Sequence, residues 1–407
     1  MTAERMASSS ELLRGFLHEL FPATEHQLIW LAGGTARDMQ LQRQIKDIDL
    51  VAALSAAQLE LLGFRPVEGK TTGSIWFRNF KAFGKVEITR IDSVEALHDD
   101  LRRRDFTVNA MLISLAGALI DPLGGRNDLA GAKLRPCSTT TFTYDPLRIF
   151  RAFRFAAEGF SLTEEAAALI RSRTWEDALL KIPVERFSRE MLKAFAAPDP
   201  QSFFRGMVEF SVGRNWLPEL FRMAQIPAGP LQNHPEGDLL AHSCEVLGRV
   251  ASVSADSLAR FCAFFHDIGK LATDPALYPQ HHGHEDAGFR TAEQFCRRLA
   301  LPTAYRRALA WISRLHGNAN RFHELRASTK IRVAEQALKG GVIEILPLLS
   351  AADKVGNTLA DDWRQVATVA RMTADELGID TARLLAMKPE NRAAFILQKR
   401  VAFLENF

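Results

Sequence analysis

The chain lacks several features that would place it in a common class of protein. Its 407 residues contain no run near the about 20 apolar residues that span a membrane, and its N-terminal segment does not have the basic start and apolar core of a secretory signal. Cys137, Cys244, Cys262 and Cys296 form no CxxC pair, so neither a zinc ribbon nor a disulfide framework is indicated. We therefore expect a cytoplasmic protein with free thiols and no membrane partner.

A large excess of charge of one sign is also missing. The 51 Lys and Arg residues against 48 Asp and Glu give a formal net charge of +3. This excess permits an acidic partner such as RNA without requiring one. Apolar residues make up 47% of the chain and charged residues 24%, which is ordinary for a globular enzyme. At roughly 150 residues per domain, the length predicts about two to four domains.

The pattern of apolar residues changes along the chain. Short apolar runs joined by Gly or Asp fill the first third, which predicts a small domain of mixed strands and helices. From Tyr144 onward nearly every segment has helical periodicity, broken mainly at Pro183, Pro200 and Pro218 and in the loop 225–236. We therefore predict an α+β fold, with a mixed-sheet head and an all-helical remainder.

Two glycines and two aspartates stand close together in the first third. Gly33 and Gly34 separate a predicted strand from a predicted helix, where backbone N–H groups can bind a triphosphate; simple turn chemistry is the commoner reason for such a pair. On a strand, Asp47 and Asp49 of DIDLV would point to the same face and could share divalent cations. Mg²⁺ held there would suit phosphoryl transfer, and a solvated strand edge is the plainer alternative.

A third charged segment is DDLRRRDFTVNAM, residues 99–111. If this stretch is helical, Arg104 and Asp105 lie within reach of Asn109. Arginine suits phosphate groups, and Asp or Asn suits ribose hydroxyls. A run of three arginines is by itself usually a solvated face.

The segment YDPLRIFRAFRF carries a helix-start signal. Asp145 is a good N-cap, Pro146 suits the first helical position, and Arg148 lies three residues further on the same face. The preceding IDPLGGRNDL, residues 120–129, predicts a tight turn whose role is architectural.

Six motifs occur in the order found in class II tRNA nucleotidyltransferases, the family of CCA-adding enzymes and bacterial poly(A) polymerases. They are GGTARD, DIDL, RRRDFTVNA, DPLGG, YDPLRIFRAFRF and IPVERFSREMLK. The chain resembles that family over its first half. The resemblance implies a nucleotidyltransferase head, a helical neck, and body and tail helices that hold the tRNA acceptor arm.

The resemblance also assigns roles to single residues. It implies that Asp47 and Asp49 are catalytic and bind Mg²⁺, and that Asp145 and Arg148 hydrogen-bond the edge of the incoming base in place of a template strand. CTP is then the expected substrate, with ATP as the second candidate. The full nucleotide-binding set is Gly33, Gly34, Arg37, Arg104, Asp105, Asn109, Asp145, Arg148 and Arg151.

Two departures from the family pattern bear on the product. The family has Glu-Asp-x-x-Arg in the fourth motif, whereas this chain has Tyr144 before Asp145, so a carboxylate expected to orient the arginine is missing. Full CCA-adding members carry a long flexible loop after the strand KVEITR, and here only residues 91–98 occupy that interval. In the family, members without the loop add CC and leave the terminal A to another enzyme. The resemblance therefore favours CC addition over full CCA addition.

A second set of ligand types lies in the back half of the chain. His242, His266, Asp267 and Asp353 form an H…HD…D series on helical segments, and such residues can hold one or two divalent ions. A single histidine among apolar residues is more often a core residue, but four ligand types in this order favour a metal site. The series resembles the HD phosphohydrolases, which are fused to some bacterial tRNA nucleotidyltransferases and linked there to 2′,3′-cyclic phosphodiesterase and phosphatase activity.

Further histidines could add ligands to this site. His316 lies between helical segments where a further HD ligand would be, and we favour it over the cluster of His281, His282 and His284, which could equally be surface residues. The metal at this site is not specified by the sequence, and neither is the oligomeric state.

Three other functions remain as alternatives: a poly(A) polymerase, an HD phosphohydrolase with a degenerate transferase site, and an RNA-binding module without catalysis. The first would need a long basic extension, which the sequence does not have. The third would leave two carboxylate-rich sets without a purpose. The expected domains are a head at 1–140, a helical neck and body at 141–231, an HD domain at 232–357 and a helical tail at 358–407.

Overall fold

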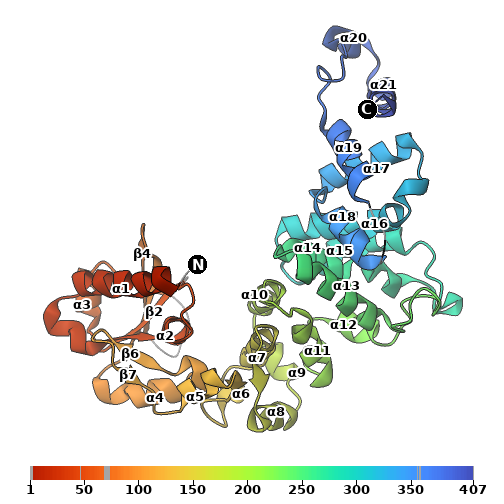
Figure 1. Cartoon of the computed structure of the whole chain (residues 1–407). Coiled ribbons are helices and arrows are strands. Elements are labelled where there is room, and N and C mark those ends of the chain that lie inside the picture. Colours follow the sequence, from red (N-terminus) through yellow and green to blue (C-terminus); the bar gives the residue numbers. More distant parts are fainter. Residues whose placement is uncertain (1–2, 46, 68–73, 355, 357–358, 407) are drawn as a thin grey trace. The chain divides into compact units, whose positions relative to one another are not determined.

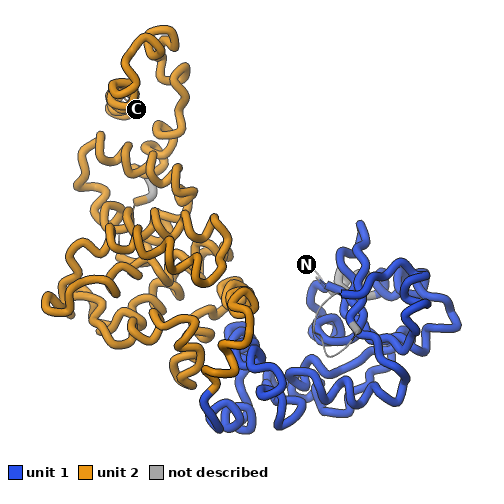
Figure 2. The backbone as a smooth tube through the Cα atoms, turned by 180° about the vertical axis from the view of Figure 1, so that it is seen from behind, with its two compact units in different colours: residues 1–174 blue, residues 175–407 orange. Residues whose placement is uncertain are grey.

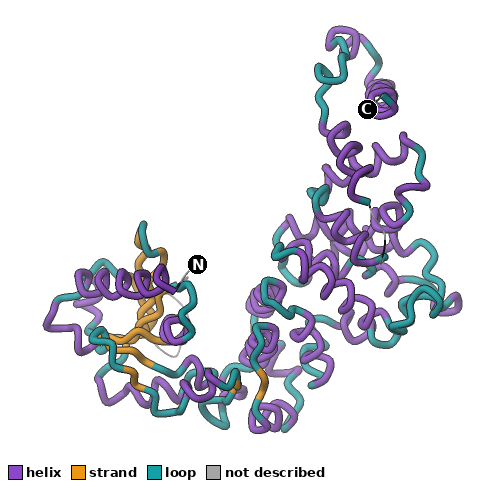
Figure 3. The backbone as a smooth tube through the Cα atoms, in the orientation of Figure 1, coloured by secondary structure: helices purple, strands orange, loops and turns teal. Residues whose placement is uncertain are grey.

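The computed structural model describes residues 3–45, 47–67, 74–354, 356 and 359–406. The chain forms two compact units, Met1–Thr174 and Trp175–Phe407 (Figure 2). Among the described residues, the strands lie in the first unit and the second unit is helical (Figure 3). None of the described helices combines the length and the hydropathy needed to cross a bilayer.

The first unit is built on a seven-stranded sheet in the order β3-β4-β5-β2-β1-β6-β7. Strands β2 and β5 run parallel, whereas the other neighbouring pairs are antiparallel. The mixed sheet predicted for the head is therefore confirmed. Its strands are β1 (Ile29–Ala32), β2 (Ile48–Ala52), β3 (Arg65–Pro66), β4 (Ser74–Phe80), β5 (Gly84–Arg90), β6 (Leu112–Ser114) and β7 (Leu119–Ile120).

Helices lie against the strands of this unit (Figure 1), and apolar side chains make the contacts. Phe16 of the first helix stacks on Phe83 with 4.2 Å between ring centroids, and Trp30 and Val51 share a buried cluster with Leu101 of α4. The helices of this unit are α1 (Ala3–Leu20), η1 (Ala23–Leu28), α2 (Gly33–Gln40), α3 (Ala56–Leu61), η2 (Val94–Ala96), α4 (Leu97–Arg102), η3 (Thr107–Asn109), α5 (Gly125–Ala130), α6 (Thr141–Tyr144), α7 (Leu147–Ala157) and α8 (Glu164–Arg171), where η marks a 3₁₀ helix.

The interval after β5 is short, and most of its residues are exposed. Residues 91–98 consist of a brief turn, η2 and the first residues of α4. Ile91 and Leu97 are buried at its two ends. The chain therefore passes from β5 to α4 through a short connection that two apolar side chains anchor.

The segment 99–111 is not the single helix that would have joined its charged residues. Helix α4 ends at Arg102, and the chain turns through Phe106 before η3 begins. Burial explains the break, because Phe106 is fully buried and an extended backbone at this point directs its ring into the core. Asp105 and Asn109 still meet, since the Asn109 amide donates to Asp105 Oδ1 at 3.0 Å.

The turn at residues 120–129 is architectural, as the sequence predicts. Both Asp121 carboxylate oxygens accept backbone N–H groups at the start of α5, from Gly125 at 2.7 Å and from Arg126 at 2.9 Å. A Cβ on Gly125 would lie 2.1 Å from the Thr107 carbonyl oxygen, so only glycine fits this close approach.

A second, two-stranded sheet joins β8 (Lys133–Leu134) and β9 (Ser161–Leu162) in parallel. Strand β9 lies in the part expected to be helical, where the chain returns after α7 to pair with β8. The described remainder of the chain is otherwise helical, so the predicted change after Tyr144 is confirmed with this one addition.

The second unit is helical, and three of its helices begin at or directly after the prolines noted in the sequence. Pro183 and Pro200 immediately precede α10 and α11, and Pro218 is the first residue of α12. The helices are α9 (Glu176–Leu179), α10 (Val184–Phe195), α11 (Gln201–Glu209), α12 (Pro218–Met223), α13 (Leu239–Val253), α14 (Ser257–Phe265), η4 (Ile268–Ala272), η5 (Pro275–Leu277), α15 (His284–Arg298), α16 (Thr303–Asn320), η6 (Phe322–Glu324), α17 (Ala327–Gly340), α18 (Ile345–Asp353), α19 (Ala360–Arg371), α20 (Thr381–Ala386) and α21 (Pro389–Glu405).

Phenylalanines form the core of the second unit. Phe204 of α11 stacks on Phe264 of α14 at 4.0 Å, and Phe195 of α10 contacts Phe204 at 5.2 Å. These rings are fully buried and hold the C-terminal end of α14 in place. His266 follows directly after that end.

A buried ion pair ties α7 to the segment before η3. Asp105 Oδ2 accepts from Arg151 Nη2 at 2.6 Å and from Nε at 2.8 Å. Burial alone would raise the pKa of Asp105, but Arg151 and the donors of Asn109 and Phe106 hold that pKa well below its ordinary value. The folded state therefore prefers the ionised carboxylate.

Replacing Asp105 with Asn should lower the free energy of unfolding of the first unit by about 2–3 kcal/mol at pH 7, because Arg151 loses a buried partner while keeping access to water. The pKa of Asp105 is depressed in the folded state, so its contribution is complete above about pH 4 and declines as the pH falls further. Guanidinium unfolding at pH 7 and pH 3 should show the difference between Asp105→Asn and the wild type narrowing at pH 3. The exposed Asp99→Asn is the matched control, and an equal loss at both pH values would contradict the assignment.

Candidate functional site

The two glycines of the first motif lie against one of the two aspartates. Gly34 is the second residue of the helix α2, and its backbone N–H donates to Asp49 Oδ2 at 3.2 Å. Gly33 has a φ of 55°, and a Cβ there would lie 3.1 Å from Asp49 Oδ2 and 3.4 Å from Arg104 Nη1. Glycine therefore lets the backbone approach both a carboxylate and a guanidinium.

Three carboxylates converge beside this turn. Asp49 lies on β2 and Asp47 immediately before it, and Glu87 of β5 lies opposite Asp49 in the parallel register. Burial and the charges of Glu87 and Asp47 raise the pKa of Asp49, and Arg104 opposes them only in part. This set of oxygen donors with excess negative charge fits a divalent cation such as Mg²⁺. The sequence analysis missed Glu87, because its place beside Asp49 depends on strand register.

Thr35 fixes the aspartates relative to the helix. Its buried hydroxyl donates to the Asp47 carbonyl at 3.1 Å and accepts from the Asp49 backbone N–H at 2.8 Å. The first turn of α2 and the start of β2 are thereby held together. This residue was also missed, although it stands within the GGTARD motif.

A chain of hydrogen bonds runs from α2 to α7. Arg37 Nη1 donates to Asn109 Oδ1 at 2.7 Å, and Asn109 Nδ2 donates to Asp105. Asp105 in turn accepts from Arg151. The structure thus brings these four predicted residues together, with Asp105 buried among them and both of its carboxylate oxygens occupied by protein donors.

Arg148 lies beside the turn that follows α4. Its Nη1 donates to the Arg104 carbonyl at 3.1 Å, and Nη2 donates to the Arg103 carbonyl at 2.5 Å. The guanidinium carbon stands 5.2 Å from the centroid of the Tyr144 ring, which is half exposed. An aromatic ring therefore contacts Arg148 at the position where the family pattern has a carboxylate.

Asp145 caps the helix that carries Arg148. Its Oδ1 accepts from the Leu147 backbone N–H at 3.1 Å. Pro146 occupies the N-cap position and α7 begins at Leu147, so the helix starts one residue later than the sequence predicts, although Asp145 still accepts from its first N–H group.

The back-half ligand set comes together from three helical elements. His242 lies on α13, His266 and Asp267 follow α14, and Asp353 ends α18. His242 Nε2 is 3.0 Å from Asp353 Oδ1, and His266 Nε2 is 3.2 Å from Asp267 Oδ2. All four side chains are at most 9% exposed, so the predicted H…HD…D series forms one buried cluster.

Two more histidines face the other oxygen of Asp267. His316 Nε2 is 3.2 Å and His284 Nε2 is 3.4 Å from Asp267 Oδ1. Asp267, His284 and His316 form a second group with the spacing of a metal site, next to the group of His242, His266 and Asp267. Asp267 is shared between the two groups.

The ring orientations of these histidines are set by bonds at Nδ1. His266, His284 and His316 have Nδ1 2.7–2.9 Å from the carbonyl oxygens of Ala263, His281 and Ser313. A carbonyl can only accept, so each Nδ1 carries the proton and donates it. In the neutral rings the Nε2 lone pairs then face the carboxylates, and those of His284 and His316 face each other at 3.2 Å.

The donor set therefore fits divalent cations. Within the described residues, His242 Nε2, His266 Nε2 and Asp267 Oδ1 are buried without a hydrogen bond, which is costly unless an ion satisfies them. Burial disfavours the charged form of His266, but Asp267 and Asp353 outweigh it and raise its pKa to about 10. In the absence of a metal ion, the carboxylates therefore favour a proton on His266, at the position where a cation would bind.

The cluster of three histidines separates into three roles. His284 joins the second group together with His316. His281 is buried, and its Nε2 donates to the Pro227 carbonyl at 2.8 Å instead. His282 is exposed. Two supporting residues were missed by the sequence analysis, because Asn320 Nδ2 donates to Asp353 Oδ2 at 2.6 Å and Ser350 donates to Asn320.

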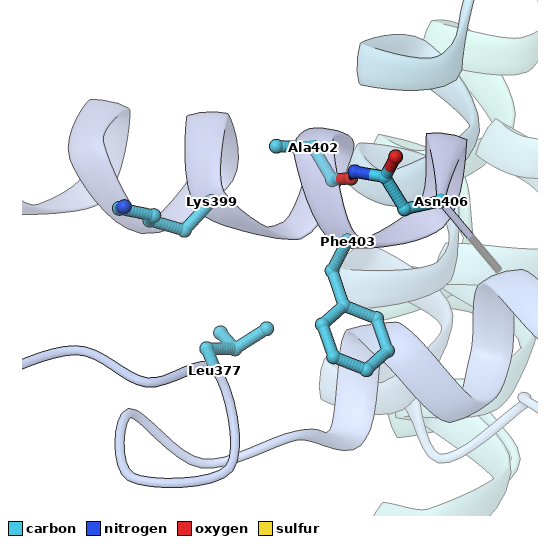
Figure 4. A pocket seen from close by; sticks show the side chains of 5 residues that line it. All are labelled: Leu377, Lys399, Ala402, Phe403 and Asn406. Atoms are coloured by element: carbon cyan, nitrogen blue, oxygen red, sulfur yellow. Dashed lines mark hydrogen bonds between the residues drawn. The ribbon is translucent and has the colours of Figure 1, made fainter.

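A pocket of about 480 Å³ lies in the C-terminal helices (Figure 4). Lys399, Ala402, Phe403 and Asn406 of the α21 region line it, and Leu377 faces them from the loop before α20. Its single cationic side chain and apolar neighbours do not form a catalytic set. It therefore supplies no candidate active site.

Sequence comparison with protein families matches three consecutive parts of the chain. Residues 69–135 match the Poly A polymerase head domain, and residues 159–223 match the family described as the probable RNA and SrmB-binding site of polymerase A. Residues 239–355 match the HD domain.

Curated relatives align with most of the chain. It is 33% identical over 392 residues to the multifunctional CCA protein of Methylococcus capsulatus, covering 87% of this chain and 90% of the relative. It is 34% identical over 332 residues to the multifunctional CCA protein of Thioalkalivibrio sulfidiphilus, covering 75% and 78%.

Solved structures share the fold. A CCA-adding enzyme in complex with CTP superposes with a TM-score of 0.64 at 19% identity, covering 93% of this chain and 87% of that one. The Thermotoga maritima CCA-adding enzyme complexed with tRNA superposes with a TM-score of 0.57 at 20% identity, covering 93% and 91%. The chain belongs to the tRNA nucleotidyltransferase family of CCA-adding enzymes and poly(A) polymerases, and carries an HD domain behind its head and RNA-binding parts.

Proposed function

We propose that the protein adds nucleotides to the 3′ end of tRNA by nucleotidyl transfer with release of pyrophosphate. The observation that carries this function is the convergence of Asp47, Asp49 and Glu87 beside the Gly33–Gly34 turn. Relatives named multifunctional CCA proteins support tRNA as the substrate. The expected division into head 1–140, neck and body 141–231, HD domain 232–357 and tail 358–407 is supported by the three matched segments, each of which falls inside one part.

The residues of the head would bind the metal ions, bind the triphosphate and position the arginines. Asp47, Asp49 and Glu87 would hold Mg²⁺, which when bound supplies positive charge to the triphosphate and lowers the barrier to attack by the 3′-hydroxyl. The Gly33–Gly34 backbone, Arg37 and Arg104, which lie close to Asp49 and Asn109, would supply donors to the phosphate oxygens. Asp105 and Asn109 would serve the nucleotide by holding Arg151 and Arg37 in place.

Base selection is assigned to Asp145 and Arg148. Arg148 is fixed by backbone carbonyls on one side and by the Tyr144 ring on the other, so its position does not depend on the carboxylate that the family pattern supplies. The interval 91–98 is short and anchored by Ile91 and Leu97, so the long loop that the family associates with terminal A addition has no counterpart there. We propose CC addition from CTP as the favoured product, with full CCA addition as the alternative.

The HD domain is proposed to hydrolyse phosphoesters. Asp267 would bridge two cations, one held with His242, His266 and Asp353 and the other with His284 and His316. Such ions, when bound, polarise a phosphoryl group and assist attack by water. The relatives of this kind carry the name multifunctional CCA protein, which agrees with a second activity beside transfer.

The products on tRNA test the transferase proposal. On tRNAs ending at the discriminator base, at C and at CC, CTP alone should extend the first two substrates and ATP should extend none. Terminal A incorporation on the CC substrate would replace CC addition with full CCA addition.

Asp49→Asn should lower incorporation by about 10³-fold or more, because it removes a ligand charge from the phosphoryl-transfer site. Unchanged incorporation by this variant would contradict the assignment of the site.

Removing the Tyr144 ring should loosen base selection. A half-exposed cation–π contact contributes about 0.5–1 kcal/mol, so Tyr144→Ala should lower the preference for CTP over UTP by about 2- to 5-fold in kcat/KM. Tyr144→Phe keeps the ring and should retain the preference. If Tyr144→Ala matched the wild type while Arg148→Ala lost selectivity, the ring would not brace the arginine.

A substitution in the HD cluster should separate the two activities. His266→Ala should lower hydrolysis of a 2′,3′-cyclic nucleotide by more than about 100-fold, since a ligand is lost, and leave CTP incorporation at the wild-type rate. The exposed His282→Ala is the matched control. Equal hydrolysis by His266→Ala and His282→Ala would exclude the HD cluster as the hydrolytic site.

A further inference from the structure

Backbone hydrogen bonds join the two ends of the loop between α12 and α13. The sequence predicts a loop here, rich in Pro, Gly and Asn, with a domain boundary near Gln232. Backbone hydrogen bonds close its two ends, from Leu239 N–H to the Ile226 carbonyl at 3.0 Å and from Ala228 N–H to the Gly237 carbonyl at 2.9 Å. The loop 226–238 is therefore fixed to the start of α13.

This loop contacts the surroundings of the HD cluster at separate points. The Ala228 carbonyl accepts from Lys270 Nζ at 2.7 Å, and the same Nζ is 2.7 Å from Asp267 Oδ2. The Pro227 carbonyl accepts from His281. Glu236, near the other end of the loop, accepts from His242 Nδ1 at 2.6 Å.

The contact between Glu236 and His242 sets the state of a metal-binding ring. The Glu236 side chain is 8% exposed, and its Oε1 accepts from His242 Nδ1 and from His234 Nδ1 at 3.0 Å. An ionised carboxylate can only accept, so the His242 proton lies on Nδ1. His242 Nε2 then presents its lone pair towards Asp353 Oδ1 at 3.0 Å and Asp267 Oδ2 at 3.7 Å.

His242 differs in this respect from the other three histidines of the cluster. Their Nδ1 atoms donate to backbone carbonyls, which no substitution removes. His242 donates to a side chain that comes from the loop. A hydrogen bond of this kind to a carboxylate fixes the tautomer and raises the basicity of a ligating imidazole.

The loop is shaped to keep Glu236 in place. The His234 ring lies edge-on to the His242 ring with 4.9 Å between centroids, and it holds Glu236 from the other side. A Cβ on Gly229 would lie 2.4 Å from His234 Cδ2, so this position must be glycine for the ring to fit. Three residues of the loop thus combine to place one carboxylate on Nδ1 of His242.

We propose that Glu236 is a positioning residue of the HD site, which acts through His242 to prepare the cation site that His242 shares with His266, Asp267 and Asp353. The loop 226–238 then forms part of that site, because it supplies the carboxylate that contacts His242. The inference rests on the proposed metal binding by the HD cluster. It concerns one of the two cation sites, because the group of Asp267, His284 and His316 does not contact Glu236 within the described residues.

Titration of the full chain with Mn²⁺, followed by calorimetry, tests the proposal. Glu236→Ala should weaken one of the two HD-site binding events by about 10- to 100-fold and leave the other within about 2-fold of wild type. Glu236→Gln keeps an acceptor oxygen but no charge, so its Mn²⁺ affinity for the weakened site should lie between those of the wild type and Glu236→Ala. The control is Glu245→Gln on α13, the helix that carries His242, where Glu245 is an exposed partner of Arg249.

Nitrogen-15 spectra of histidine-labelled chain supply a readout that a merely structural role would not move. In the metal-free wild type, His242 should carry its proton on Nδ1, and Glu236→Gln should shift its tautomer equilibrium while His266, His284 and His316 keep theirs. A wild-type His242 protonated at Nε2 alone, or Mn²⁺ binding by Glu236→Ala equal to that of Glu245→Gln, would overturn the proposal. Absence of Mn²⁺ binding at the HD cluster of the wild type itself would instead refute the metal site on which the proposal rests.

Discussion

The need to compensate buried negative charge governs the second unit of this protein. Asp267 is buried, with one carboxylate oxygen towards His242 and His266 and the other towards His284 and His316. Lys270 Nζ lies 2.7 Å from Asp267 Oδ2 and supplies one positive charge, whereas Asp353 adds a second carboxylate beside His242 and His266. Phenylalanine packing, backbone carbonyls at Nδ1 and the closed loop before α13 all hold this arrangement in place. The fold thereby stores a site whose electrostatic cost falls when divalent cations bind.

The head applies the same constraint in a more open setting. Asp49 is crowded by Asp47 and Glu87, and its counter-charge comes from Arg104 and from the backbone of the glycine turn. Hydrogen bonds then run from Arg37 of α2 through Asn109 and Asp105 to Arg151 of α7, the helix that bears Arg148. One set of contacts therefore links the helix after the glycine turn to the helix proposed to take part in base selection.

Local signals in the sequence were sufficient for much of the account. The glycine turn, the alternation of Asp47 and Asp49, the prolines before helices and the H…HD…D series predict elements and ligands that the structure brings together. What could not be predicted depends on register and on long-range packing. Glu87 faces Asp49 only because β2 and β5 are parallel neighbours, and Asn320 meets Asp353 through the packing of α16 on α18. Glu236 belongs to a loop whose composition indicated only a domain boundary. The break after Arg102 likewise follows from burial of Phe106 and not from any local breaker.

The central claim is that one chain holds two separate carboxylate-centred cation sites, one for nucleotidyl transfer and one for phosphoester hydrolysis. Anomalous diffraction from crystals soaked in Mn²⁺ measures this directly. The account predicts density beside Asp49 and Glu87 in the head, and two further peaks on opposite sides of Asp267, within bonding distance of His242 and His266 on one side and of His284 and His316 on the other. Absence of density at Asp267, with Lys270 Nζ still on its carboxylate, or absence of density at Asp49 when CTP is bound, would contradict the account.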